Sequence, residues 1–147
     1  MPTLFDPSAR GEIVSRLSKL TPDRRPLWGR MDAALVQVHL IGSLRIATGD
    51  LVCKPKKTIL GYPGMRELLI HVLPWPKGAP TAPELLVASS AEFEEDKRTL
   101  RELVEQVGTR KPEEPFAVHP AFGRLSRRTW GVLGWRHLDH HLRQFGL

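Results

Sequence analysis

The sequence contains a single cysteine and no long apolar run, and both absences exclude whole classes of protein. Cys53 cannot form an intrachain disulfide, so the fold does not rest on a disulfide framework. No segment approaches the roughly 18 to 20 consecutive apolar residues that a membrane helix needs. The first residues, MPTLFDPSARGE, lack the basic start, apolar middle and small-residue cleavage site of an export signal. We therefore expect no membrane association and a cytoplasmic location.

Acidic and aromatic residues are also in short supply. The chain has 16 Asp and Glu residues against 22 Lys and Arg, and only 7% of its residues are aromatic. A net charge of +6 raises the question of nucleic-acid binding. However, the basic clusters at 24–25, 54–57 and 127–128 are short and have no interleaved aromatic side chains of the kind that stack on bases. These features favour a solvated basic surface over nucleic-acid binding.

What is present is the composition of an ordinary globular domain. The 147 residues are 41% hydrophobic and 26% charged, which is enough to bury a core without disulfides or a partner. The sequence has no internal repeat, no low-complexity tract and no marked shift in composition. We expect one domain that covers residues 1–147.

Apolar residues recur at helical spacing in four segments, residues 7–20, 29–48, 89–108 and 126–146. Typical start and stop residues flank these segments: Asp6 before Pro7, Ser89 three residues before Glu92, Ser126, and the stops Gly49, Gly108 and Gly146. The sequence therefore predicts an all-α protein, a four-helix bundle whose second and third helices are joined by a long connection.

That connection, residues 51–89, is rich in proline. Its prolines, at positions 55, 63, 74, 76, 80 and 83, exclude a long helix, because each removes a hydrogen-bond donor and restrains the residue before it. We expect a short helix over 65–72 and extended chain through LPWPKGAPTAP, with Trp75 packed on the bundle. A connection of this length often covers a site as a lid.

Two histidines near the end of the chain have the spacing of metal ligands. His137 and His141 are four residues apart, so on a helix they lie on one face, one turn from each other. Trp130, Leu133 and Phe145 occupy the same stripe, which indicates that the pair faces the interior. Burying two imidazoles without hydrogen-bond partners costs on the order of several kcal/mol, as it does for other unpartnered polar groups. A shared metal ion removes that cost.

A third ligand should come from a facing helix, and His39 is the histidine placed at the edge of another apolar face. Three imidazoles would leave a coordination position open for water or substrate and suit zinc, nickel, iron or copper. A lone histidine such as His39 is also typical of a hydrogen-bonded core residue. His71, His119 and His140 are interpreted as solvated or helix-capping residues, the last because it is about 100° around the helix from His141.

Three stretches, HPAFGRLSRRTWGVLGWRHLDHHLRQFGL, WGRMDAALVQVHLIGSLRIATGD and LPWPKGAP, resemble the DinB/YfiT-like superfamily over nearly the whole chain. Within it, the chain is most similar to the bacterial branch catalogued as a domain of unknown function. HLDHHLRQFG is specific to that branch. The WPKGAP loop departs from the characterised members, which puts the transfer of their substrates in doubt.

The resemblance implies a four-helix bundle with a long crossover, frequent homodimers, and one zinc or nickel ion on three histidines. The ligand positions of the family match His39, His137 and His141. Characterised members are metal-dependent transferases or isomerases that use a low-molecular-weight thiol. The side chains that orient the ligands cannot be chosen from sequence alone, although Asp32 and Gln144 are close enough along the chain to reach them.

Two functional hypotheses follow. The first is a metal-dependent transferase or hydrolase-like enzyme whose ion activates a thiol or water on a small molecule. The second is a non-catalytic, stress-related protein that binds a metal and a ligand without turnover. No residue pair outside the histidines has the pattern of a general acid and base, and Cys53, beside Lys54 in a loop, is assigned no role.

Overall fold

The computed structural model describes residues 1–55, 59–75, 77 and 92–147. In this part of the chain the protein is all-helical, and its only strand-like pairing is an isolated bridge between His119 and Gly123. The elements in chain order are α1 (Pro7–Ser18), α2 (Ala33–Thr48), the 3-10 turn η1 (Ile59–Gly61), α3 (Met65–His71), α4 (Phe93–Thr109) and α5 (Arg127–Gln144). The all-α prediction is confirmed, and so is the short helix expected within the connection.

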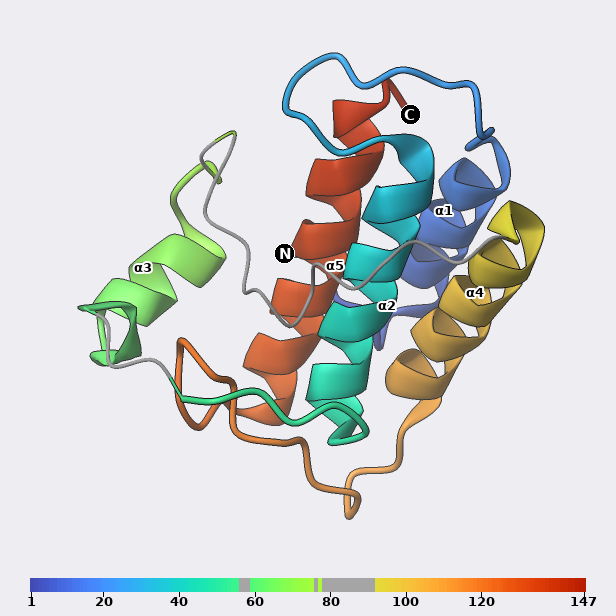
Figure 1. Cartoon of the computed structure of the whole chain (residues 1–147). Helices are drawn as coiled ribbons and strands as arrows, with labels where there is room; N and C mark the ends of the chain where they lie inside the picture. Colours follow the sequence, from blue (N-terminus) through green and yellow to red (C-terminus); the bar gives the residue numbers. More distant parts are fainter. Residues whose placement is uncertain (56–58, 76, 78–91) are drawn as a thin grey trace.

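Four helices, α1, α2, α4 and α5, lie side by side around a common core (Figure 1). Helix α2 packs against α4 and α5, and α1 packs against the same two helices from the other side. The core that they enclose consists of aliphatic side chains and one aromatic ring, among them Leu4, Ile13, Leu17, Leu40, Leu100, Val104, Leu138 and Phe145. None of the described helices is long and apolar enough to span a bilayer.

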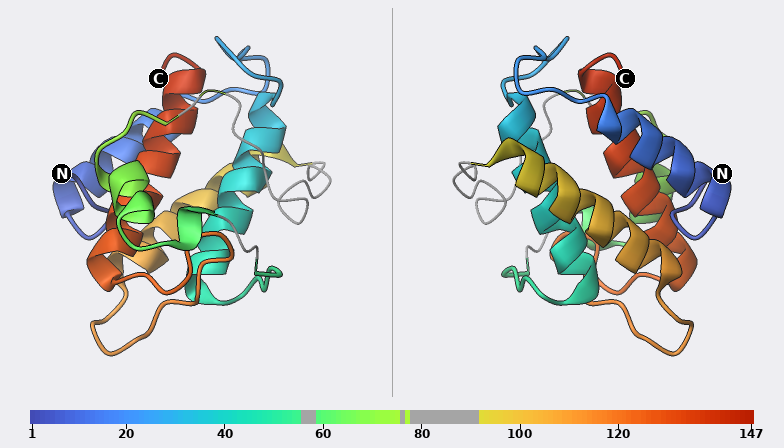
Figure 2. Two further views of the ribbon diagram at one scale, coloured as in Figure 1. Left: turned by 90° about the vertical axis from the view of Figure 1, so that its left-hand side faces the viewer. Right: turned by 90° about the vertical axis from the view of Figure 1, so that its right-hand side faces the viewer.

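The short helix α3 stands outside this group and lies against α5, as Figure 2 shows. Arg136 of α5 holds it there, because its guanidinium donates to the carbonyls of Leu69, Ile70 and Leu73 at the carboxyl end of α3. Trp75, just beyond, donates from Nε1 to the Leu69 carbonyl. The ring of Trp75 also contacts that of His137, with centroids 5.6 Å apart, so Trp75 packs on α5 as the sequence predicted. Residues 76 and 78–91, which include the rest of the expected extended segment and the Ser89 cap, lie outside the described residues.

Side-chain caps determine where three helices begin. Asp6 accepts from the Ser8 amide at the start of α1, and Ser126 accepts from the Thr129 amide at the start of α5. Asp32 accepts from the Leu35 amide, so α2 begins at residue 33 and not at the predicted residue 29. The apolar pattern extended the prediction because Met31, although outside the helix, still packs against the core.

Of the three glycines predicted to stop a helix, two lie just after a helix end and the third does not. Gly49 ends α2 with φ of 89°, and Gly146 follows α5 with φ of 69°. Gly108 is not a stop, because α4 continues through Thr109. A Cβ at residue 108 would lie 2.5 Å from the Leu4 carbonyl oxygen, so this glycine allows the N-terminal segment to approach α4.

Candidate metal centre

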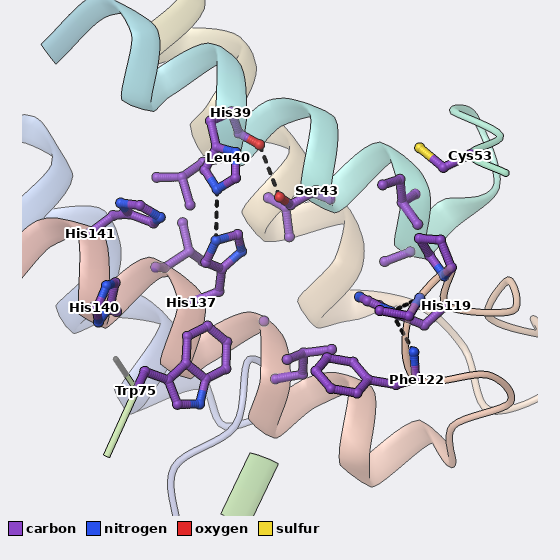
Figure 3. A pocket seen from close by; sticks show the side chains of 18 of the residues that line it. His39, Leu40, Ser43, Cys53, Trp75, His119, Phe122, His137, His140 and His141 are labelled. Atoms are coloured by element: carbon purple, nitrogen blue, oxygen red, sulfur yellow. Dashed lines mark hydrogen bonds between the residues drawn. The ribbon is translucent and has the colours of Figure 1, made fainter. Parts of the chain in front are cut away.

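Three histidines from two helices meet on the inner face of the helix group. His39 comes from α2, and His137 and His141 come from successive turns of α5. Their ring centroids lie 4.8 to 4.9 Å apart, and one ring nitrogen from each lies within 4.8 Å of the others. These are the three residues that the sequence selected, and Figure 3 shows their rings pointing toward one another. A triad of this kind could hold a metal ion.

The closest approach is between His39 and His137, whose Nε2 atoms are 2.9 Å apart. In a neutral pair one Nε2–H donates to the lone pair of the other Nε2, so the two nitrogens share one proton between them. Ligand nitrogens of a tetrahedral zinc site lie about 3.3 Å apart when each is about 2.0 Å from the ion. If the rings of His39 and His137 moved slightly apart, their Nε2 atoms would therefore have the spacing of two ligands on one zinc ion. His39 Nδ1 is buried and has no hydrogen-bond partner among the described residues.

The environment keeps all three rings neutral. Burial, together with the charge of His140, lowers the pKa of His39 to about 4. Burial also lowers the pKa of His141 to about 3, with a further contribution from His39. The pKa of His137 falls well below the ordinary histidine value, mainly through burial and then through repulsion by its two neighbours. Because a metal ligand must be a neutral imidazole, the triad presents donors that need no deprotonation at neutral pH.

One of the two candidate orienting residues contacts the triad and the other does not. Gln144 Oε1 accepts from His141 Nδ1 at 2.8 Å, so the lone pair of His141 lies on Nε2, the nitrogen away from Gln144. The Gln144 amide nitrogen donates to the Trp28 carbonyl at 2.8 Å and is thereby fixed in turn. Asp32 instead caps α2. Gln144 is the residue positioned to orient a ligand.

His140 does not join the triad, as its place on the helix predicted, but it is not the solvated residue we expected. Its ring contacts Trp28 and Trp75, with centroids 6.0 Å away in each case. Its pKa is lowered by burial, an effect that the nearby Asp139 carboxylate opposes. Lys77 lies 4.6 Å above the ring of Trp28. The side chains of His140, Trp28, Trp75 and Lys77 line a cavity beside the triad.

The cavity has a volume of about 710 Å³ and runs from the triad to the loop that precedes α5. Its walls are mostly apolar, and they include Leu40, Leu44, Ile46, Leu60, Leu69, Phe122, Trp130 and Leu133. The charged residues among the described lining are all basic: Arg30, Lys54 and Lys77. A space of this size and character suits a small organic molecule.

Two lining residues to which the sequence gave no role lie at the end of the cavity away from the triad. Cys53 follows α2 there, and His119 belongs to the loop before α5 (Figure 3). The sequence carried no signal for either, because each reaches the cavity through the path of a loop and not through helical periodicity. His71, by contrast, pairs with Glu67 on α3 at 3.0 Å and lies outside the cavity.

Comparison with known proteins gives a family but no activity. A family model described as a protein of unknown function (DUF1569) matches residues 60–146, which is more than half of the chain. The matched region contains α3, α4 and α5, and with them His137, His141 and His119, whereas His39 precedes it. No curated protein and no solved structure matches the chain.

Proposed function

The chain belongs to the DUF1569 family, whose description assigns no reaction, and we propose from its site that the protein binds one divalent metal ion through His39, His137 and His141. The observation that carries this proposal is the convergence of three neutral imidazoles on one point beside a cavity. The 2.9 Å approach of the Nε2 atoms of His39 and His137 is further support, since two ligand nitrogens this close need to move apart only slightly to bind the same ion.

The bound ion serves a reaction of a small molecule in this proposal. An ion with an open position acts as a Lewis acid and lowers the pKa of a bound thiol or water. The cavity supplies an apolar environment that limits access of water, and Arg30, Lys54 and Lys77 attract an anionic substrate. A metal-dependent transferase, with a low-molecular-weight thiol as one substrate, or a hydrolase fits this arrangement.

The finer structural assignments belong to the same proposal. We regard α1, α2, α4 and α5 as a four-helix bundle of the DinB/YfiT-like type, formed by one domain over residues 1–147. Zinc and nickel are the ions that we favour, because three nitrogen donors with an open position suit both. A cytoplasmic location, which rests on the single cysteine of the sequence, and a homodimer, which rests on the sequence resemblance alone, complete the proposal.

A ligand-binding protein without turnover is the second candidate. The described lining of the cavity contains no Asp or Glu, so a carboxylate general base is not provided there. In this case the ion fixes α2 to α5 or anchors the ligand, and the cavity stores or senses a molecule that is not altered.

Elemental analysis by plasma mass spectrometry tests the metal proposal. The protein is purified without an affinity tag, a chelator or nickel resin, and is compared with His137→Ala and with His140→Ala as the matched control. We expect near-stoichiometric metal in the wild type and in His140→Ala, and its loss in His137→Ala with the helical circular dichroism retained.

Three outcomes contradict the proposal. Full metal content in His137→Ala excludes this residue as a ligand, and loss of metal in His140→Ala shows that the wrong face of α5 was chosen. If the wild type holds no metal and neither zinc nor nickel restores any, the triad is a set of buried histidines and ligand binding without a metal becomes the leading function.

A further inference from the structure

His119 occupies the wall of the cavity opposite the triad, in the loop between α4 and α5. The loop closes on itself there, because the amides of His119 and Gly123 each donate to the carbonyl of the other at 2.9 Å. Figure 3 shows the ring directed into the cavity, with two hydrogen bonds on the side of the loop. The position of this ring is therefore set by local backbone geometry and does not depend on the triad.

Those two hydrogen bonds also set the tautomer. His119 Nδ1 accepts from the amides of Ala121 and Phe122, both at 3.1 Å. Backbone amides can only donate, so Nδ1 carries a lone pair and no proton. The proton of the neutral ring must lie on Nε2. Burial lowers the pKa of His119 to about 4, so the ring stays neutral at physiological pH.

Aromatic neighbours hold the ring in place. The centroid of Phe122 is 4.6 Å from that of His119, and the centroid of Trp130 is 5.3 Å away. Trp130 is itself fixed by donating from Nε1 to the Ala117 carbonyl at 3.2 Å. The N–H of His119 is thus already oriented before a ligand binds. Binding therefore costs less conformational entropy of this side chain.

The Nε2–H has no acceptor within the described part of the chain. The cavity that it faces is lined mostly by apolar side chains, among them Phe122 and Leu133, and Cys53, whose sulfur is at most a weak acceptor, lines the same end. A donor that faces a largely apolar cavity is typical of a ligand-binding group, because it fixes the orientation of a molecule held mainly by apolar contact.

We propose that His119 is a ligand-binding residue, which donates from Nε2 to a carbonyl oxygen of an apolar small molecule held in the cavity. The inference deepens the proposed function, on which it rests for the choice of cavity. It adds that the substrate carries a carbonyl group on an apolar body, at a distance from the atom that the ion engages. His119 selects for this group and takes no part in holding the metal.

A purely structural role must be separated from this one, since His119 also holds the loop. Substitution by asparagine separates the two roles. The asparagine Oδ1 occupies the position of the histidine Nδ1 and can accept from the amides of Ala121 and Phe122, but no donor remains at the position of Nε2. His119→Asn therefore keeps the hydrogen bonds to the loop amides and removes the N–H that faces the cavity. His119→Gln, which can extend an amide N–H toward the position of Nε2, is the variant expected to restore part of the binding.

The experiment uses acetophenone, which has a carbonyl, and ethylbenzene, which has the same apolar body without one. Binding to the metal-free full chain is followed by NMR through the indole N–H of Trp130, so the result does not depend on the metal site. Wild-type protein should bind acetophenone about three- to tenfold more tightly than ethylbenzene, as expected for one net hydrogen bond. His119→Asn should bind the two probes with equal affinity while its helical circular dichroism is retained, and His119→Gln should regain part of the preference for acetophenone.

Three results overturn the proposal: equal affinity of the wild type for the two probes, an intact preference in His119→Asn, or failure of acetophenone to bind at its solubility limit. Nitrogen NMR of the free protein gives an independent check, because a proton found on Nδ1 of His119 excludes the donor at Nε2. A failed metal analysis with a retained preference for acetophenone would refute the metal proposal and leave the role of His119 standing.

Discussion

Gln144 and His141 form a hydrogen-bonded pair one turn apart on α5, with Oε1 accepting from Nδ1 at 2.8 Å. Gln144 is itself buried, and its amide nitrogen donates to the Trp28 carbonyl. The preceding loop approaches so closely that a Cβ on Gly29, which has φ of 78°, would lie 2.7 Å from the Gln144 nitrogen. The loop before α2 therefore fixes Gln144, and Gln144 fixes the ring of His141.

Replacing Gln144 tests this chain of contacts. Gln144→Leu keeps the approximate volume and removes the acceptor, so His141 loses its fixed tautomer and orientation. We expect metal affinity to fall about 10- to 100-fold, as for other residues that orient a metal-binding histidine. Competition with a chelator of known zinc affinity measures the change. Gln106→Leu on the exposed face of α4 is the matched control and should bind as the wild type does.

The pH dependence of stability follows from the low pKa values of the buried histidines. In the unfolded chain these groups take up protons near the ordinary pKa of 6.5, whereas folded His39 does so only at about 4. The unfolded state thus binds more protons between these values, so stability is fully present above pH 6.5 and falls as the pH is lowered toward 4. One such histidine contributes about 1.4 kcal/mol per pH unit.

Urea unfolding of the chelator-treated protein checks this expectation. Between pH 6.5 and pH 5 the free energy of unfolding should fall by about 1.5 kcal/mol from His39 alone, and by more if His119 and His141 act in the same sense. Most carboxylates remain ionised over this window, so they do not account for a loss of this kind. A constant free energy of unfolding between the two pH values would show that the histidines are hydrated in the folded protein.

Much of the helical framework and the pair His137 and His141 could be predicted because both depend on short-range spacing. His39 lies on α2 and was selected by its place at the edge of another apolar face and by the family resemblance. Asp6, Ser126 and Gly49 act where they stand in the sequence, and His137 and His141 share a face on any helix. The role of His119 could not be predicted, since the tautomer of its ring depends on the path of a loop. The start of α2 was missed for a related reason: Met31 packs on the core without being helical, so periodicity alone could not locate the Asp32 cap.

Alanine substitutions at two helical glycines, one in a crowded and one in an open position, test the packing around α4. At Gly108 a Cβ would meet the Leu4 carbonyl oxygen and the Arg10 Cδ at 2.5 Å each, whereas at Gly11 it would meet nothing within 4 Å. Gly108→Ala should therefore destabilise the protein by about 1 to 3 kcal/mol through overpacking. Gly11→Ala should stabilise it by about 0.5 to 1 kcal/mol, because alanine loses less backbone entropy in a helix. Thermal and urea unfolding measure both, and equal effects of the two substitutions would contradict the packing of residue 4 against α4.

Arg136 offers a test of how the cavity is closed. Its guanidinium donates to three carbonyls at the end of α3 and lies 5.6 Å from the ring of Trp75, which in turn contacts His137. Arg136→Met keeps much of the aliphatic stem and removes every donor, so α3 and Trp75 should separate more readily from α5. The core between α1, α2, α4 and α5 does not include this residue and should be little affected.

Hydrogen exchange distinguishes local from global loss of structure in this variant. The amides of Leu68, Val72 and Leu73, which are bonded within and just after α3, should exchange at least about tenfold faster, since the loss of even one hydrogen bond to a charged donor costs about 1.5 to 3 kcal/mol. Amides of α4 should keep their protection. Arg101→Met, on the exposed side of α4, is the control and should change neither set. Unchanged exchange at residues 68–73 in Arg136→Met would mean that apolar contacts alone hold α3, and Trp75 would then cover the triad without the help of Arg136.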